Sequence, residues 1–173
     1  MNYSQLIGCD VNNAIGFSVT LFVSGCGKNP KCKGCHNSIA WDFNYGEPYT
    51  QETEDKIIKA LSNPHIGTLS ILGGEPMDNL SGGELLKLVR RVRRELPDKK
   101  IFCWTGYLYE NLIKDEQRLE FIKELDFLRD GEYIPELRNL NQRFQGSTNQ
   151  RSIDVKQSLM KGEVIEYGVE NIK

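Results

Sequence analysis

Three cysteines lie within ten residues near the start of the chain, in the segment Cys26-Gly-Lys-Asn-Pro-Lys-Cys32-Lys-Gly-Cys35. The segment directly follows an apolar run, Val19–Val23, whose composition is typical of a β-strand. Glycine, lysine, asparagine and proline between the cysteines predict an exposed loop. Three thiolates on a loop that leaves a strand can hold an iron–sulfur cluster by three of its irons and leave the fourth iron open. The loop therefore predicts metal chemistry at Cys26, Cys32 and Cys35.

Composition limits what else the chain can be. It has 173 residues, of which 39% are hydrophobic and 27% are charged, so we expect one folded domain over residues 1–173. Five cysteines, three of them crowded together, fit a secreted disulfide framework poorly. We expect Cys9 and Cys103 to be small buried core residues. No apolar run approaches the roughly 20 residues of a spanning helix, and no signal pattern opens the chain, so we expect a cytoplasmic protein that does not contact a membrane.

The charge pattern gives little reason to expect a nucleic-acid partner. The formal net charge is only −2, and no large excess of basic residues would attract a phosphate backbone. One basic run, Arg90–Arg94, stands out on a predicted helix. We expect it to be a solvated helix face, with a docking patch for an acidic partner as the alternative.

Strand and helix signals alternate along the chain. Strands are predicted at Ser18–Ser24, Thr68–Leu72, Lys100–Thr105 and Phe127–Arg129, with weaker signals at Ser152–Val155 and Val164–Glu166. Helices are predicted at Thr50–Leu61, from a capping box at Ser81-Gly-Gly-Glu84 to Leu96, and over Tyr109–Leu125 with a break near Asp115. This alternation predicts parallel strands joined by right-handed crossovers. Because there are too few units to close an eight-stranded barrel, we expect an α/β fold with a mostly parallel sheet, an open partial (βα) barrel.

The topology brings two loops to the same edge of the sheet. Ligands of such sheets bind at the carboxyl ends of the strands, where the cysteine loop and the segment Gly73-Gly74-Glu75-Pro76 both fall. Two glycines let a ligand approach the backbone closely, so that carbonyl oxygens can accept from an ammonium group, and Glu75 can add a charge-assisted bond. An ordinary turn explains the glycines equally well when they are taken alone.

A zinc site is the alternative interpretation of the cysteine loop. A structural zinc ion takes four protein ligands, and His36 is the available fourth one. However, His36 directly follows Cys35, and adjacent residues rarely reach one metal together. The second ligand pair of a zinc module is also missing from the sequence. An iron–sulfur cluster with an open iron, by contrast, can bind the amino and carboxylate groups of S-adenosylmethionine, and one electron from the cluster can then break a carbon–sulfur bond.

Taken together, these motifs resemble the radical S-adenosylmethionine superfamily, and within it the activating enzymes of glycyl-radical proteins. The cysteine loop carries the wider resemblance. Cys35–Asn37 followed by Trp41-Asp42 carries the resemblance to the glycyl-radical activating enzymes. The narrowest one, to the activating proteins of anaerobic ribonucleoside-triphosphate reductases, is carried by Leu21–Cys26, Trp104–Tyr107, Asp130-Gly131, Phe144–Ser147 and Asn149–Asp154. These segments run from the first predicted strand almost to the C-terminus.

The resemblance implies a function for the chain. A flavodoxin-like donor would reduce a 4Fe-4S cluster held by Cys26, Cys32 and Cys35. Bound S-adenosylmethionine would be cleaved to methionine and a 5′-deoxyadenosyl radical, which removes a hydrogen atom from a glycine of the large reductase subunit. Gly73, Gly74 and Glu75 would bind the methionine amino group, and His36 would lie beside the adenine. An activase of another glycyl-radical enzyme, such as pyruvate formate-lyase, is the neighbouring alternative.

The chain departs from the family pattern at two places, and several roles stay open. The usual spacing is C-x3-C-x2-C, whereas five residues separate Cys26 from Cys32. The family's Asn-Gly-Pro-Gly-x-Arg stretch reads Asn13-Ala-Ile-Gly-Phe-Ser18, without the arginine. His36 is alternatively a solvated loop residue. Trp104 and Tyr107 line the adenosine pocket or the groove that receives the partner's glycine loop, with packing in the core as the alternative. The segment 142–151 is either a surface loop or a segment that closes the pocket or faces the partner.

Overall fold

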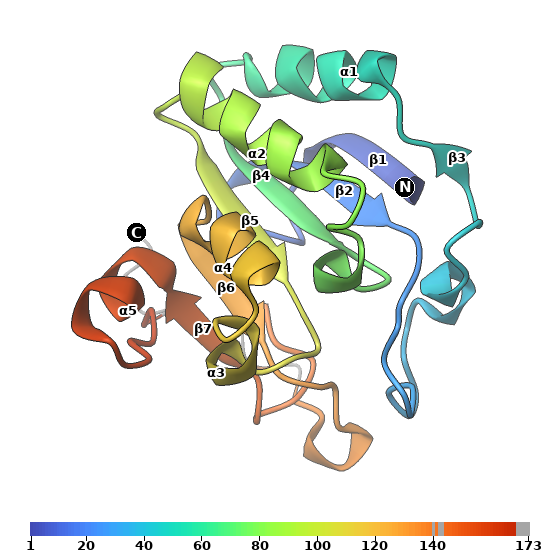
Figure 1. Ribbon diagram of the computed structural model, residues 1–173, viewed down its shortest axis with the longest axis vertical. Helices are drawn as coiled ribbons and strands as arrows, with labels where there is room; N and C mark the ends of the chain where they lie inside the picture. Colours follow the sequence, from blue (N-terminus) through green and yellow to red (C-terminus); the bar gives the residue numbers. More distant parts are fainter. Residues whose placement is uncertain (140, 142–143, 169–173) are drawn as a thin grey trace.

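A computed structural model describes residues 1–139, 141 and 144–168 of the chain. The fold is built on one open sheet (Figure 1). Its strand order is β3-β1-β2-β4-β5-β6-β7. The strands are β1 (Asn2–Asp10), β2 (Phe17–Val23), β3 (Glu47–Pro48), β4 (Ile66–Gly73), β5 (Lys100–Trp104), β6 (Phe127–Asp130) and β7 (Arg151–Asp154). Neighbours among β2, β4, β5 and β6 pair in parallel, whereas β1, β3 and β7 pair antiparallel. The prediction of an α/β fold with an open, mostly parallel sheet is therefore confirmed.

Helices cover one face of this sheet. They are α1 (Gln51–Leu61), α2 (Glu84–Glu95), α3 (Tyr109–Leu112), α4 (Glu116–Lys123) and α5 (Val155–Lys161), with short 3-10 turns at Ser38–Trp41, Pro76–Asp78 and Pro135–Leu137. Figure 1 shows α1, α2 and α4 on the same side of the strands. Alternate strand residues face them and are fully buried, among them Val19, Leu21, Leu69, Ile71, Ile101 and Leu128. The apolar stripe of α2, including Leu85, Val89 and Val92, packs on these residues and forms the core.

A loop covers the opposite face of the sheet near its middle. The side chains on this face include Ser70 and Trp104, which donate hydrogen bonds to the carbonyl oxygen of Asn13 at 2.8 and 3.1 Å. Thr68 donates in the same way to the carbonyl of Ile15. Polar side chains of β4 and β5 are thus satisfied by the backbone carbonyls of Asn13 and Ile15, and these bonds hold the loop against this face of the sheet.

Several predicted elements need correction at their ends. The first strand is β1, not β2; most of its residues are half-exposed and polar residues interrupt it, so its alternation signal is weak. The capping box at Ser81 is also wrong. Gly83 precedes α2 with a φ of 77° and no side-chain cap, and the Glu84 carboxylate instead pairs with the amino group of Met1. The break near Asp115 is confirmed, because Asp115 caps α4 by accepting from the Arg118 backbone N–H.

Two further predictions are wrong in part. Cys103 is buried as expected, but Cys9 is exposed, because it lies in the exposed part of β1, toward the end of the strand. The basic run on α2 is not simply solvated. Arg91 pairs with Glu54 at 3.0 Å, and Arg93 pairs with the buried Asp126 at 2.8 Å, so the run fastens α2 to neighbouring elements. No helix in the parts of the chain that the structure describes is both long and apolar enough to cross a bilayer.

Candidate metal centre

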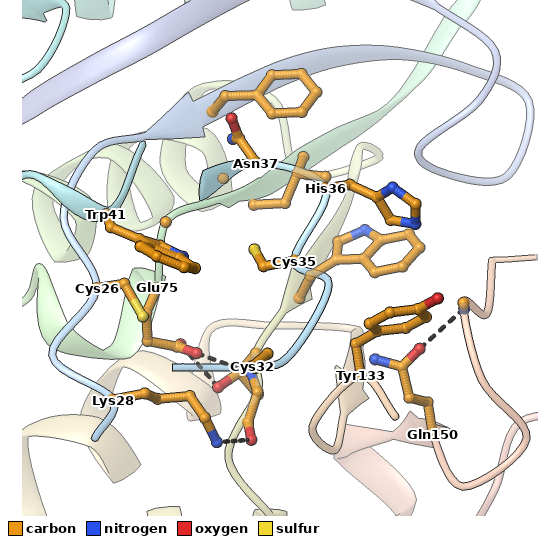
Figure 2. A pocket seen from close by; sticks show the side chains of 18 of the residues that line it. Cys26, Lys28, Cys32, Cys35, His36, Asn37, Trp41, Glu75, Tyr133 and Gln150 are labelled. Atoms are coloured by element: carbon orange, nitrogen blue, oxygen red, sulfur yellow. Dashed lines mark hydrogen bonds between the residues drawn. The ribbon is translucent and has the colours of Figure 1, made fainter. Parts of the chain in front are cut away.

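The cysteine loop starts at the carboxyl end of β2 and is fixed there by backbone hydrogen bonds. Gly25 N–H donates to the carbonyl of Ala40 at 2.8 Å, and Cys26 N–H donates to that of Trp41 at 3.1 Å. Cys26 is buried, and Cys32 and Cys35 are half-buried. All three side chains line one cavity with a volume of about 370 Å³, which is within the usual range of ligand pockets. Figure 2 shows them around the space that Glu75 also faces.

The glycine loop at the end of β4 is joined directly to the cysteine loop. Gly74 N–H donates to the carbonyl of Val23 at 2.8 Å, and Glu75 N–H donates to that of Gly25 at 2.7 Å. A Cβ atom at Gly74 would stand 2.3 Å from the carbonyl oxygen of Gly25, and one at Gly73, whose φ is +118°, would stand 2.4 Å from that of Val23. These positions therefore require glycine, because a side chain would push the two loops apart. Both glycines also line the cavity.

Glu75 carries the buried carboxylate of the site. The carboxylate accepts hydrogen bonds from the Thr105 hydroxyl at 2.7 Å, from Gly106 N–H at 2.8 Å and from Met77 N–H at 3.1 Å. Burial outweighs these bonds and raises the pKa of Glu75 to about 7. A cationic ligand beside this group would favour its ionised form, so the residue is suited to meet an ammonium group.

Two of the three thiols, those of Cys26 and Cys32, have a pKa that their surroundings shift toward the neutral form. Burial raises the pKa of Cys26, and burial together with the charge of Glu132 raises the pKa of Cys32. Metal binding would displace these protons, as it does in other thiolate sites. A single metal ion needs its ligands about 2.0–2.3 Å from one point, and no three Cys, His, Asp or Glu side chains of the described residues gather in that way. The three thiols line one cavity, and a cluster would present a separate iron to each sulfur.

The cavity is also lined by other residues, and the sequence predicted only some of them as site residues. His36, predicted to lie beside an adenine, is exposed, and its ring contacts that of Tyr133 at 5.4 Å between centroids. Tyr133 was not predicted, although its position just after β6 places it at the carboxyl edge of the sheet. Lys28 was also missed; its place inside the cysteine loop was the available signal. The remaining lining residues are Asn13, Phe22, Asn37, Trp41, Leu72, Trp104, Thr105, Gly106, Gly131, Gly146 and Gln150.

The structure separates the roles of Trp104 and Tyr107. Trp104 lines the cavity, and the buried guanidinium of Arg129 lies 5.7 Å from its ring centroid, which helps to fix the indole. Tyr107 packs against the core, and its hydroxyl donates to Asp78 at 3.1–3.2 Å. Packing against the core therefore fits Tyr107, whereas Trp104 lines the cavity.

The segment 142–151 contributes to the cavity wall, although residues 142 and 143 lie outside the described residues. Gly146 and Gln150 line the cavity. The Gln150 side chain accepts from Gly146 N–H at 2.9 Å and donates to the carbonyl of Gly131 at 2.9 Å, so it joins this segment to the turn after β6. Arg151 extends the connection by pairing with the buried Asp130 and with Glu110.

A family model described as "4Fe-4S single cluster domain" matches residues 13–153, which include all three cysteines of the cavity, and this match places the chain in the single-cluster iron–sulfur class. Proteins named anaerobic ribonucleoside-triphosphate reductase-activating protein are similar over 87% of this chain. The one from Vibrio cholerae is 43% identical and the one from Haemophilus influenzae 40%, each covered over 96% of its length. The one from Enterobacteria phage T4 is 36% identical and covered over 92%. The chain belongs to this family of activating proteins.

Proposed function

We propose that this chain is an enzyme that uses a 4Fe-4S cluster and S-adenosylmethionine to install a glycyl radical on the large subunit of an anaerobic ribonucleoside-triphosphate reductase. The observation that carries the proposal is the single cavity shared by Cys26, Cys32, Cys35 and the Gly73–Glu75 loop. The names of the relatives support the same activity. The sheet supports it as well, because both loops leave the carboxyl ends of adjacent parallel strands, as in an open partial (βα) barrel of the radical S-adenosylmethionine type.

In this proposal the protein holds the reacting groups and keeps water away from them. When bound, a reduced cluster supplies the electron that cleaves S-adenosylmethionine to methionine and a 5′-deoxyadenosyl radical, which takes hydrogen from a glycine of the partner. Cys26, Cys32 and Cys35 would each bind one iron through sulfur. The carbonyls of Gly73 and Gly74 and the carboxylate of Glu75 would accept hydrogen bonds from the methionine ammonium. His36, at the exposed edge of the cavity, would lie beside the adenine.

An experiment with two candidate partner proteins distinguishes this activity from that of a related activase. The reconstituted protein, dithionite and S-adenosylmethionine would be incubated anaerobically with the large reductase subunit or with pyruvate formate-lyase, and each mixture examined by electron paramagnetic resonance. We expect a glycyl radical on the reductase and none on the lyase. A radical on the lyase alone would assign the chain to a different glycyl-radical system. A flavodoxin-like donor and a cytoplasmic location stay predictions from the sequence.

Replacing Glu75 by glutamine should weaken S-adenosylmethionine binding by at least about tenfold, because a charge-assisted hydrogen bond contributes about 1.5–3 kcal/mol. Binding would be measured by equilibrium dialysis on protein with wild-type iron content.

5′-Methylthioadenosine, which lacks the amino-acid group, provides the control for this variant. Its affinity should be the same for the wild-type and Glu75→Gln proteins if Glu75 contacts the ammonium group. Unchanged binding of S-adenosylmethionine, or equal losses for both ligands, would contradict the proposed contact.

A further inference from the structure

The cysteine loop carries a lysine whose charge is held inside the cavity wall. Lys28 lies between Cys26 and Cys32 and lines the same cavity as both. Its ammonium group donates to the carbonyl of Gly106 at 2.8 Å, and its side chain is only 12% exposed. It also lies 4.9 Å from the centroid of the Tyr107 ring. Lys28 is therefore fixed in place by contacts with the loop after β5.

Glu132 is the acidic group closest to this lysine. Its carboxylate is 3.4 Å from the Lys28 ammonium, but its side chain is 43% exposed, so water screens its charge more than that of Lys28. Two further carboxylates, Glu75 and Asp78, act on Cys26 from the side of the glycine loop. The cysteine site thus has several negative neighbours, and two lysines of the loop oppose them: Lys31, whose ammonium donates to the carbonyl of Cys26, and Lys28, which acts on Cys32 and is held in the cavity wall.

Lys33 belongs to the same loop but has a different environment. It directly follows Cys32, yet its side chain is 82% exposed and, within the described part of the chain, pairs only with the exposed Glu136 at 3.3 Å. Proximity in sequence would make Lys33 the stronger influence on a group held by Cys32. Burial would make Lys28 the stronger one, because a charge surrounded by protein is screened less than a charge in water. The two lysines therefore form a matched pair.

We propose that Lys28 raises the reduction potential of the iron–sulfur cluster held by Cys26, Cys32 and Cys35. The inference rests on the proposed function only in requiring that the cluster is present. One-electron reduction, here by dithionite, makes the cluster and its thiolates more negative by one charge. A fixed cation in the cavity wall stabilises that reduced form, and net charge near a cluster is one of the quantities that set its potential. Lys28 thereby makes the cluster easier for an electron donor to reduce.

The test measures the potential directly and not the activity. The protein and its variants would be reconstituted anaerobically, analysed for iron, and titrated against potential while the reduced cluster is followed by electron paramagnetic resonance. We expect Lys28→Gln to shift the midpoint to lower potential, and Lys28→Arg, which keeps the charge, to stay close to the wild type. Lys33→Gln should shift it less than Lys28→Gln.

A variant that removes a negative charge near Lys28 distinguishes an effect of charge on the potential from an effect of a disturbed loop. Glu132→Gln removes the carboxylate that contacts Lys28, so it should shift the midpoint to higher potential, whereas mere loosening of the loop would move both glutamine variants in the same direction. A cluster whose potential is unmoved by Lys28→Gln, or is moved as much by Lys33→Gln, would overturn this inference alone. Failure of the wild-type protein to hold any cluster would overturn the proposed function together with it.

Discussion

Replacing Cys32 by alanine should remove the cluster and S-adenosylmethionine cleavage together. Cys32 is one of the three thiols that line the cavity, and two remaining thiolates cannot anchor three irons. Wild-type protein should hold about four irons per chain after anaerobic reconstitution, and the variant should hold few or none. The same preparations, reduced with dithionite, would be assayed for 5′-deoxyadenosine, and the variant should produce none above background.

Cys9 and Cys103 provide the controls for this prediction. Cys9 is exposed on β1, and Cys103 is buried on the helix-covered face of β5; neither lines the cavity. Cys9→Ala and Cys103→Ala should therefore keep the wild-type iron content, although the buried substitution lowers the free energy of unfolding by leaving a small void. Full iron content in Cys32→Ala, or loss of iron in either control, would mean that the ligands are assigned wrongly.

Replacing Gly74 by alanine should have the second largest effect, on stability and iron content at once. The added Cβ would stand 2.3 Å from the Gly25 carbonyl oxygen and 2.6 Å from that of Ala40. Both carbonyls belong to backbone that supports Cys26, so relief of the clash displaces the cysteine loop. We expect the free energy of unfolding to fall by roughly 2 kcal/mol or more, as overpacking of a tight site does, and iron retention to fall with it.

Gly67→Ala is the matched control for this substitution. Gly67 lies on the same strand, β4, is exposed, and no atom of the residues that the structure describes lies within 4 Å of an added Cβ. This variant should keep its iron, and its free energy of unfolding should be unchanged or slightly raised, since alanine restricts the unfolded chain more than glycine does. Chemical denaturation and iron analysis of both variants would check the contrast. Equal behaviour of the two would show that the close approach of the loops at Gly74 does not matter.

The sequence predicted those parts of the fold whose signals are strong and local. β4 and β5 are buried apolar runs, and the stripe on α2 repeats at helical spacing, so their positions were predicted to within a few residues. The start of α2 was not predicted, because the Glu84 side chain found a partner far away in sequence, at Met1. β1 was missed because an antiparallel strand that is half-exposed shows no clear alternation.

The part of the candidate site that consists of local sequence motifs was also predictable. The residues that reach it from distant loops were not. The three cysteines and the Gly-Gly-Glu segment can be recognised in the sequence. Because ligands bind at the carboxyl ends of parallel strands, both motifs were predicted to lie at the same edge of the sheet. Tyr133 and Gln150 reach the cavity through loops whose course depends on tertiary contacts such as Gln150 with Gly131, and the burial of Lys28 depends on its contact with Gly106. No local pattern reports such contacts, so the charges around the cavity became apparent only in the structure.

The most direct measurement is the yield of 5′-deoxyadenosine from anaerobically reconstituted, dithionite-reduced protein that has been given S-adenosylmethionine. A thiolate-held cluster with an open iron predicts a brown protein that forms 5′-deoxyadenosine and methionine in equal amounts. A colourless protein loaded with zinc, forming neither product, would contradict the account.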